Sequence, residues 1–62
     1  MQYRIKEIRK KKRMTQKELS ELAGISRTTI SKLENGEECE IMVGTLNAIA
    51  NALKVSVRSL FY

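Results

Sequence analysis

Polar side chains recur at helical spacing in the stretch from Arg27 to Asn35 of this 62-residue sequence. Positions three and four apart share one face of a helix, so a helix that buries Ile30 and Leu33 must turn its polar residues outward. The outward face would carry Arg27, Thr28, Ser31, Lys32 and Asn35. It offers long donors and small hydroxyls and contains no acid. Such a face suits a helix that lies between phosphate ridges and reaches base edges, and an arginine there can bond a guanine through two hydrogen bonds.

The segment before this face has the residues of a tight corner between two helices. Gly24 stands where a helix would end in a left-handed residue, Ile25 can fill the corner, and Ser26 is a good cap for the next helix. Exposed backbone amides around Ser26 would favour a phosphate. The pattern predicts a helix-turn-helix, whose close crossing also favours a small residue such as Ser20. A polar helix face alone is more often simply solvated, but the corner ahead of it favours nucleic-acid reading.

The helix before the corner has its own start signal. TQKE, from Thr15 to Glu18, has the form of a capping box, in which hydroxyl and carboxylate each bond the other residue's backbone amide. The spacing of Leu19, Leu22 and Ala23 predicts that these three side chains form the core face. The following helix is expected to end at Gly36.

Further helices are expected on both sides of the motif. The first covers about residues 3–12, with Ile5 and Ile8 inward, and a fourth covers about 43–53. The apolar stripe of this fourth helix consists of Val43, Leu46, Ile49, Ala50 and Leu53. Ser56 is expected to cap a last short helix that carries Val57, Leu60 and Phe61. The sequence therefore predicts an all-α domain of five helices that spans residues 1–62.

Charge favours a polyanionic partner. Twelve Lys and Arg against seven Asp and Glu give a formal net charge of +5. Basic residues concentrate in RKKKR, from Arg9 to Arg13, and acids in ENGEECE, from Glu34 to Glu40. The basic run also suits the negative end of the first helix dipole, so charge alone does not decide for nucleic acid.

Other classes of function find little support. A single cysteine and no histidine exclude an internal disulfide and the usual zinc sites, and we expect neither metal nor cofactor. No nucleophile and base, and no carboxylate pair, is spaced for catalysis, so we do not expect an enzyme. No apolar run approaches the roughly 20 residues of a membrane span, and the amino terminus lacks the apolar core of a signal peptide. We therefore expect a cytoplasmic protein.

The stretch TQKELSELAGISRTTISKLENG closely resembles the helix-turn-helix of the Cro and phage-repressor family, also called the xenobiotic-response-element family. IKEIRKKKRMTQ resembles the first helix of that family, and LNAIANALKVSVRSLF resembles its fourth and fifth helices. The resemblance implies a lambda-repressor-like DNA-binding domain. This sequence departs from the family in lacking a proline before the fourth helix, where EECEIMV forms a longer and more acidic connection.

The resemblance also implies roles for individual residues. Arg27, Thr28 and Lys32 match base-reading positions, and Ser31 lies on the same face. Gln16 and Asn35 match phosphate-binding positions of the family. Together with the backbone amides around Ser26, they are the expected contacts to DNA phosphates. Arg9 and Glu34 match a pair that forms a buried salt bridge in several members of the family.

These features lead to two hypotheses about function. The first is a homodimeric, sequence-specific regulator of transcription, expected to be a repressor, that binds a palindromic operator in double-stranded DNA. The candidates for its dimer interface are Ile41, Met42, Leu60, Phe61 and Tyr62, although these residues could instead close a small core. The second is an antitoxin-like or anti-repressor-like module whose main role is to bind a protein partner.

Overall fold

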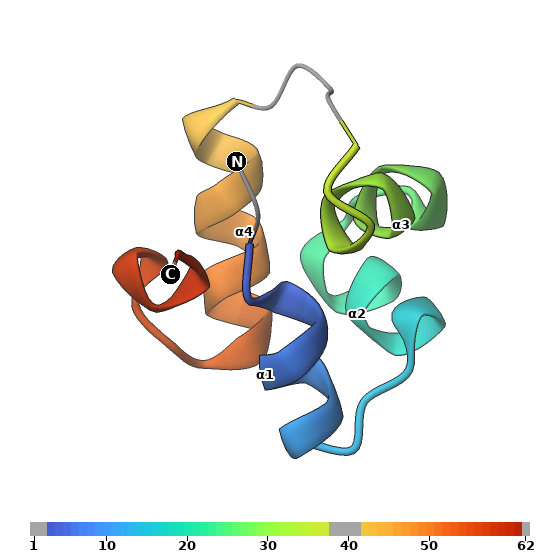
Figure 1. The fold of residues 1–62 in the computed structure, drawn as a ribbon, viewed down its shortest axis with the longest axis horizontal. Helices are drawn as coiled ribbons and strands as arrows, with labels where there is room; N and C mark the ends of the chain where they lie inside the picture. Colours follow the sequence, from blue (N-terminus) through green and yellow to red (C-terminus); the bar gives the residue numbers. More distant parts are fainter. Residues whose placement is uncertain (1–2, 38–41, 62) are drawn as a thin grey trace.

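The computed structural model describes residues 3–37 and 42–61. Its elements are α1 (Ile5–Lys11), α2 (Gln16–Ala23), α3 (Arg27–Glu34), α4 (Val43–Leu53) and a 3-10 helix, η1 (Val57–Leu60). The described part of the chain is therefore all-helical, as predicted, but the last of the five expected helices is a single 3-10 turn. Figure 1 places α3 on the opposite side of the molecule from η1.

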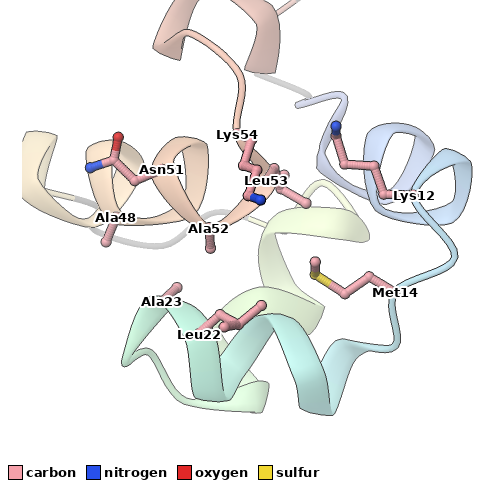
Figure 2. Close-up of a pocket in the computed structure, with 9 residues that line it drawn as sticks. All are labelled: Lys12, Met14, Leu22, Ala23, Ala48, Asn51, Ala52, Leu53 and Lys54. Carbon is pink, nitrogen blue, oxygen red and sulfur yellow. The ribbon is translucent and has the colours of Figure 1, made fainter.

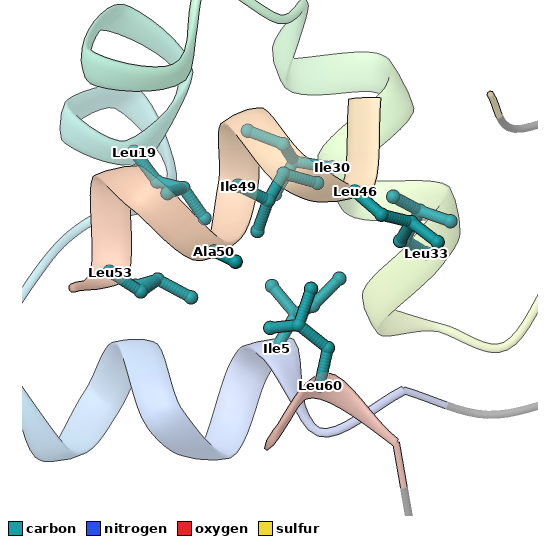
Figure 3. Packing of buried hydrophobic residues seen from close by; sticks show 9 residues of the cluster. All are labelled: Ile5, Leu19, Ile30, Leu33, Leu46, Ile49, Ala50, Leu53 and Leu60. Atoms are coloured by element: carbon teal, nitrogen blue, oxygen red, sulfur yellow. The ribbon is translucent and has the colours of Figure 1, made fainter. Parts of the chain in front are cut away.

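The core lies where all five elements meet. Helix α2 packs against α3 and α4, η1 packs against α4, and α1 packs against α3. Nine buried apolar side chains from these elements converge (Figure 3): Ile5, Leu19, Ile30, Leu33, Leu46, Ile49, Ala50, Leu53 and Leu60. Each of the short helices buries only one apolar stripe, so their stability depends on this shared contact.

The predicted corner between α2 and α3 is confirmed. Thr15 Oγ1 accepts from the Glu18 amide at 3.0 Å, and Glu18 Oε1 accepts from the Thr15 amide at 3.1 Å. At the other end of α2, Gly24 is left-handed, with φ 69° and ψ 33°. Ser26 caps α3, because its hydroxyl accepts from the amide of Thr29 at 3.2 Å. The small Ser20 lets the two helices approach and donates its hydroxyl hydrogen to the carbonyl of Ile25.

Helix ends are closed by left-handed residues, of which two are cations. Gly36 follows α3 with φ 73°, as the sequence predicts. Arg13 follows α1 with φ 55°, and Lys54 follows α4 with φ 58°, although glycine or asparagine usually occupies this position. A side chain with a Cβ in this conformation costs roughly 1 to 2 kcal/mol. Ser56 precedes η1, but its hydroxyl pairs with that of Ser59 at 3.0 Å instead of capping a backbone amide.

Two of the predicted core residues are exposed. Leu22 has 64% of its surface exposed and Val43 has 73%. Successive residues turn about 100° around a helix, so Leu22 and Ala23 diverge to opposite sides of Leu19 by about 60° and 40°. Ala23 is half-buried against the core, whereas Leu22 is not. Val43 is the first residue of α4 and follows the exposed Met42, ahead of the buried part of the stripe.

The two ends of the described chain meet beside the core. The Arg4 amide donates to the Leu60 carbonyl at 2.7 Å, and Tyr3 and Phe61 form a single antiparallel bridge with ring centres 5.3 Å apart. Leu60 is fully buried, so its assignment to a dimer surface is wrong and its alternative role in closing the core holds.

The other dimer candidates have different positions. Phe61 is half-buried, whereas Met42 is 77% exposed. Ile41 and Tyr62 lie outside the described residues. No helix in the described part of the chain is long and apolar enough to cross a membrane.

Candidate nucleic-acid interface

The polar face predicted for α3 lines a shallow hollow on the surface. Its walls are formed by Gln16, Arg27, Thr28, Ser31, Lys32 and Glu37. Arg27, Thr28 and Lys32 are exposed, while Ser31 is half-buried. All four predicted base-reading residues therefore lie together, and Gln16 from the start of α2 joins them. The hollow presents hydrogen-bond donors and hydroxyls to the solvent, as the helical spacing indicates.

An ion pair and its hydrogen bonds connect α3 to α1. Arg9 Nε donates to Glu34 Oε2 at 2.8 Å, and Arg9 Nη2 donates to Glu34 Oε1 at 3.1 Å. The third guanidinium nitrogen, Nη1, donates to the carbonyl of Met14 at 2.7 Å. The expected salt bridge is present, and the Glu34 side chain is only 1% exposed. Arg9 is thus engaged in a buried structural contact, whereas its four successors in the RKKKR run are exposed.

Gln16 connects this network to the hollow. Its Nε2 donates to Glu34 Oε1 at 3.0 Å, so Glu34 holds Arg9 from α1 and Gln16 from α2 at once. The primary amide of glutamine has a second N–H and a carbonyl oxygen for further partners. Since Gln16 also lines the hollow, it can bond a ligand there while one of its hydrogens stays on Glu34.

Ser26 and Asn35 lie at the two ends of α3 and do not line the hollow. The Ser26 hydroxyl is engaged as the helix cap. Asn35 follows the last residue of α3, and its Nδ2 donates to Ser31 Oγ at 3.4 Å. Both residues are exposed, at positions that flank the four base-reading candidates.

Glu37 is a residue of the hollow that the sequence analysis did not identify. After the left-handed Gly36 the chain folds back along α3, and the Glu37 amide donates to the Lys32 carbonyl at 2.9 Å. A helix ending at glycine often closes with this bond, so the Glu-Asn-Gly-Glu stretch contained the signal. The fold-back places an acid at the edge of a surface that is otherwise basic and polar.

Charges on α1 are partly paired away from the hollow. Glu7 Oε1 lies 3.3 Å from Arg4 Nη2 and 3.8 Å from Lys11 Nζ. The hydrogen bond from Arg4 is the main reason that the pKa of Glu7 falls below its ordinary value, and the positive charges of Arg4 and Lys11 add to the effect.

Comparison with known families and structures agrees with this architecture. The family model described as "Helix-turn-helix" matches residues 5–60. The restriction-modification controller protein C.AhdI from Aeromonas hydrophila is 29% identical, with a TM-score of 0.86 over 94% of this chain and 86% of that one. SinR, a master regulator for biofilm formation solved in complex with DNA, is 32% identical, with a TM-score of 0.83 over 90% of this chain and 89% of that one. A SinR protein/SinI protein complex gives the same identity and TM-score, and 54% of that chain is covered. No curated protein matches.

The family match extends over nearly all described residues, and α2, the Gly24 corner and α3 form the motif after which the family is named. The chain belongs to the helix-turn-helix family of DNA-binding transcriptional regulators of the Cro and C1-repressor type, which is not a family of enzymes.

Proposed function

We propose that this protein binds double-stranded DNA in a sequence-specific manner as a homodimer, with α3 in the major groove, and represses transcription in the cytoplasm by occupying a promoter. The observation that carries the proposal is the hollow in which Gln16 of α2 faces four polar side chains of α3. Its basic side chains are exposed, and the helix that presents them is fixed by the buried Arg9–Glu34 pair. Rigid presentation matters because reading a base edge requires a defined geometry.

The proposed contacts divide into two kinds. Base edges are read by Arg27, Thr28, Ser31 and Lys32, and phosphates are held by Gln16, Ser26 and Asn35. Arg27 lies at the amino end of α3, the part of a recognition helix that usually enters the groove. The SinR structure supports DNA as the partner, since that relative was solved in complex with DNA.

A dimer is proposed because α3 has only eight residues and can reach few base pairs. Two copies related by a two-fold axis would read half-sites about 34 to 36 Å apart, one turn of the duplex. Of the described candidates for the interface, Met42 has the most exposed apolar side chain, at 77%. Phe61 is half-buried, with its ring centre 5.3 Å from that of Tyr3.

Selection on a random duplex library at two salt concentrations tests the proposal. The expected result is a palindrome with half-site centres about 10 base pairs apart, bound with a steep salt dependence. Weak binding without sequence preference would contradict it. A Met42→Glu variant should keep its fold, sediment as a monomer and lose the palindrome while retaining weak half-site binding.

The second candidate function is the binding of a protein partner, which the SinR protein/SinI protein complex favours as an observation on a relative. Changing Arg27 and Lys32 together to alanine separates the two candidates, because both side chains are exposed and neither belongs to the core. If DNA reading is the main function, the double variant no longer produces the biological effect of the unmodified protein. If partner binding is the main one, the effect survives.

A further inference from the structure

An apolar groove lies between α2 and α4. None of its residues lines the hollow formed by Gln16, Glu37 and the polar face of α3, which is called the DNA-reading hollow below because of its proposed role. Figure 2 shows Leu22 and Ala23 of α2 opposite Ala48 and Ala52 of α4, with Met14 at one end. Leu22 is one of the most exposed large apolar side chains of the described chain, at 64%. The small alanine side chains leave open space along the line where the two helices pack.

Two lysines stand at the end of the groove that is nearer to Met14. Lys12 follows the last residue of α1, and Lys54 follows the last residue of α4. Within the described residues neither lysine forms an ion pair, and no acid lines the groove. An occupant therefore needs an apolar strip and at least one acid at the matching end.

The backbone of Lys54 adds to this argument. Its φ of 58° is a conformation that glycine adopts most easily, yet the position holds a long cation at the groove rim. A requirement for folding alone would favour glycine at this position. The backbone conformation therefore does not favour lysine here, and its ammonium group has no ion-pair partner among the described residues.

A second copy of this chain is a poor occupant of the groove. In a two-fold contact the groove of one protomer meets the groove of the other; since no acid lines it, Lys12 and Lys54 of one protomer meet no carboxylate there and add positive charge on both sides. Like charges in such a contact oppose association. A groove walled by two helices instead fits a third helix with apolar side chains at i, i+3 or i+4, and i+7.

We propose that the α2–α4 groove binds an acidic amphipathic helix of a partner protein. The apolar side chains of that helix would cover Leu22 and the three alanines, and its carboxylates would meet Lys12 and Lys54. Since no groove residue belongs to the DNA-reading hollow, a partner can bind while α3 is occupied. The proposal does not depend on the proposed DNA function and would stand if that function failed.

The test uses phage-displayed helical peptides of 14 residues, about four turns, which matches the molecular dimensions of 20 to 25 Å. One helix face is randomised among Leu, Ala, Gln, Glu and Lys, and the chain of residues 1–62 is the bait. The expected result is enrichment of peptides with a leucine strip and glutamates at one end. Fluorescence anisotropy should then show at least tenfold tighter binding than that of a matched peptide with lysine in place of glutamate.

Variants of the protein locate the binding site. Leu22→Gln should lower peptide affinity at least tenfold, while Val43→Gln, an equally exposed apolar position outside the groove, should leave it unchanged. Changing Lys12 and Lys54 together to glutamate should reverse the preference toward the lysine peptide. Lys54→Gly should weaken peptide binding without lowering the unfolding midpoint, which a purely structural lysine would not do.

Three outcomes would overturn the proposal. If the unmodified protein enriches acidic peptides no more strongly than a Leu22→Gln bait does, the groove has no such ligand. Peptide binding that survives both Leu22→Gln and the lysine reversal would place the ligand elsewhere. Self-association that sedimentation detects in the unmodified chain and that Leu22→Gln abolishes would assign the groove to a second copy.

Discussion

Arg9 and Glu34, 25 residues apart in the sequence, form a two-pronged ion pair that joins α1 to the end of α3, with N–O distances of 2.8 and 3.1 Å. Their side chains are 10% and 1% exposed. Because Gln16 also bonds Glu34, a single carboxylate sets the relative positions of α1, α2 and α3. The hollow lined by Gln16 and the polar face of α3 is therefore supported by a buried polar contact and not only by apolar packing.

Replacing Arg9 by methionine should unfold much of the protein. The change leaves the Glu34 carboxylate buried beside an apolar side chain, and breaking one partner of a buried pair costs roughly 3 to 5 kcal/mol. Small domains have a total free energy of unfolding of about 5 to 15 kcal/mol, so this loss is large. Urea unfolding followed by circular dichroism measures it.

The double variant Arg9→Met, Glu34→Leu is the matched control. It removes both charges and keeps apolar volume, so it should recover most of the lost stability. Equal destabilisation of the single and double variants would contradict the ion-pair explanation.

Gly24→Val should unfold the helix-turn-helix because of backbone conformation alone. A Cβ at Gly24 would meet no heavy atom within 4 Å, so crowding does not contribute. The φ of 69° costs an alanine roughly 1 to 2 kcal/mol, and a β-branched side chain more. Gly44→Ala is the control, since Gly44 lies in α4 with open space around it, and it should stabilise by roughly 0.5 to 1 kcal/mol. A well-folded Gly24→Val protein would contradict the requirement for a left-handed glycine between α2 and α3.

The corner was predictable because its signals are local: a capping threonine, a glycine and a capping serine each act within a few residues. The exposure of Leu22 and Val43 was not, because periodicity gives the apolar stripe of a helix but not how much of it the neighbours cover. Burial of Leu60 depends on α4 and on the segment around Arg4, which lies at the opposite end of the sequence. The approach of Glu37 to Lys32 depends on the turn at Gly36, so a residue assigned to a polar loop lies in the candidate site.

Arg27→Ala should reduce binding to the selected operator by roughly 1 to 3 kcal/mol and relax the preference at one base pair. The reason is the loss of a two-bond contact to a base edge, and Arg27 is exposed and outside the core. Competition binding with single-base operator variants measures both effects. Asn35→Ala, at the proposed phosphate contact, should weaken all sequences alike. Equal losses on operator and random DNA for Arg27→Ala would exclude base reading by this residue.

Acid should weaken the Arg4–Glu7 contact on α1. The hydrogen bond from Arg4 lowers the pKa of Glu7 below 4.5, so its folded-state pKa is lower than its unfolded one. The contact therefore adds stability at pH above 4.5, and this contribution is lost as pH falls through the lower, folded-state pKa. An NMR titration of the Glu7 carboxyl should show the low pKa, and Arg4→Gln should raise it. An unchanged titration in Arg4→Gln would exclude Arg4 as the cause.

Glu37→Gln should strengthen binding to DNA of any sequence. The carboxylate lies at the edge of the hollow, where it repels phosphates that approach Arg27 and Lys32. Removing its charge should raise affinity for random duplex DNA several-fold and steepen the salt dependence by up to about one unit of log–log slope. Glu21→Gln changes the net charge equally at an exposed α2 position outside the hollow, and it should have a smaller effect. If Glu37→Gln and Glu21→Gln raise the affinity for random DNA equally, net charge alone accounts for the gain. If Glu37→Gln raises the affinity for random DNA but lowers that for the operator, the carboxylate accepts a hydrogen bond from a base amino group.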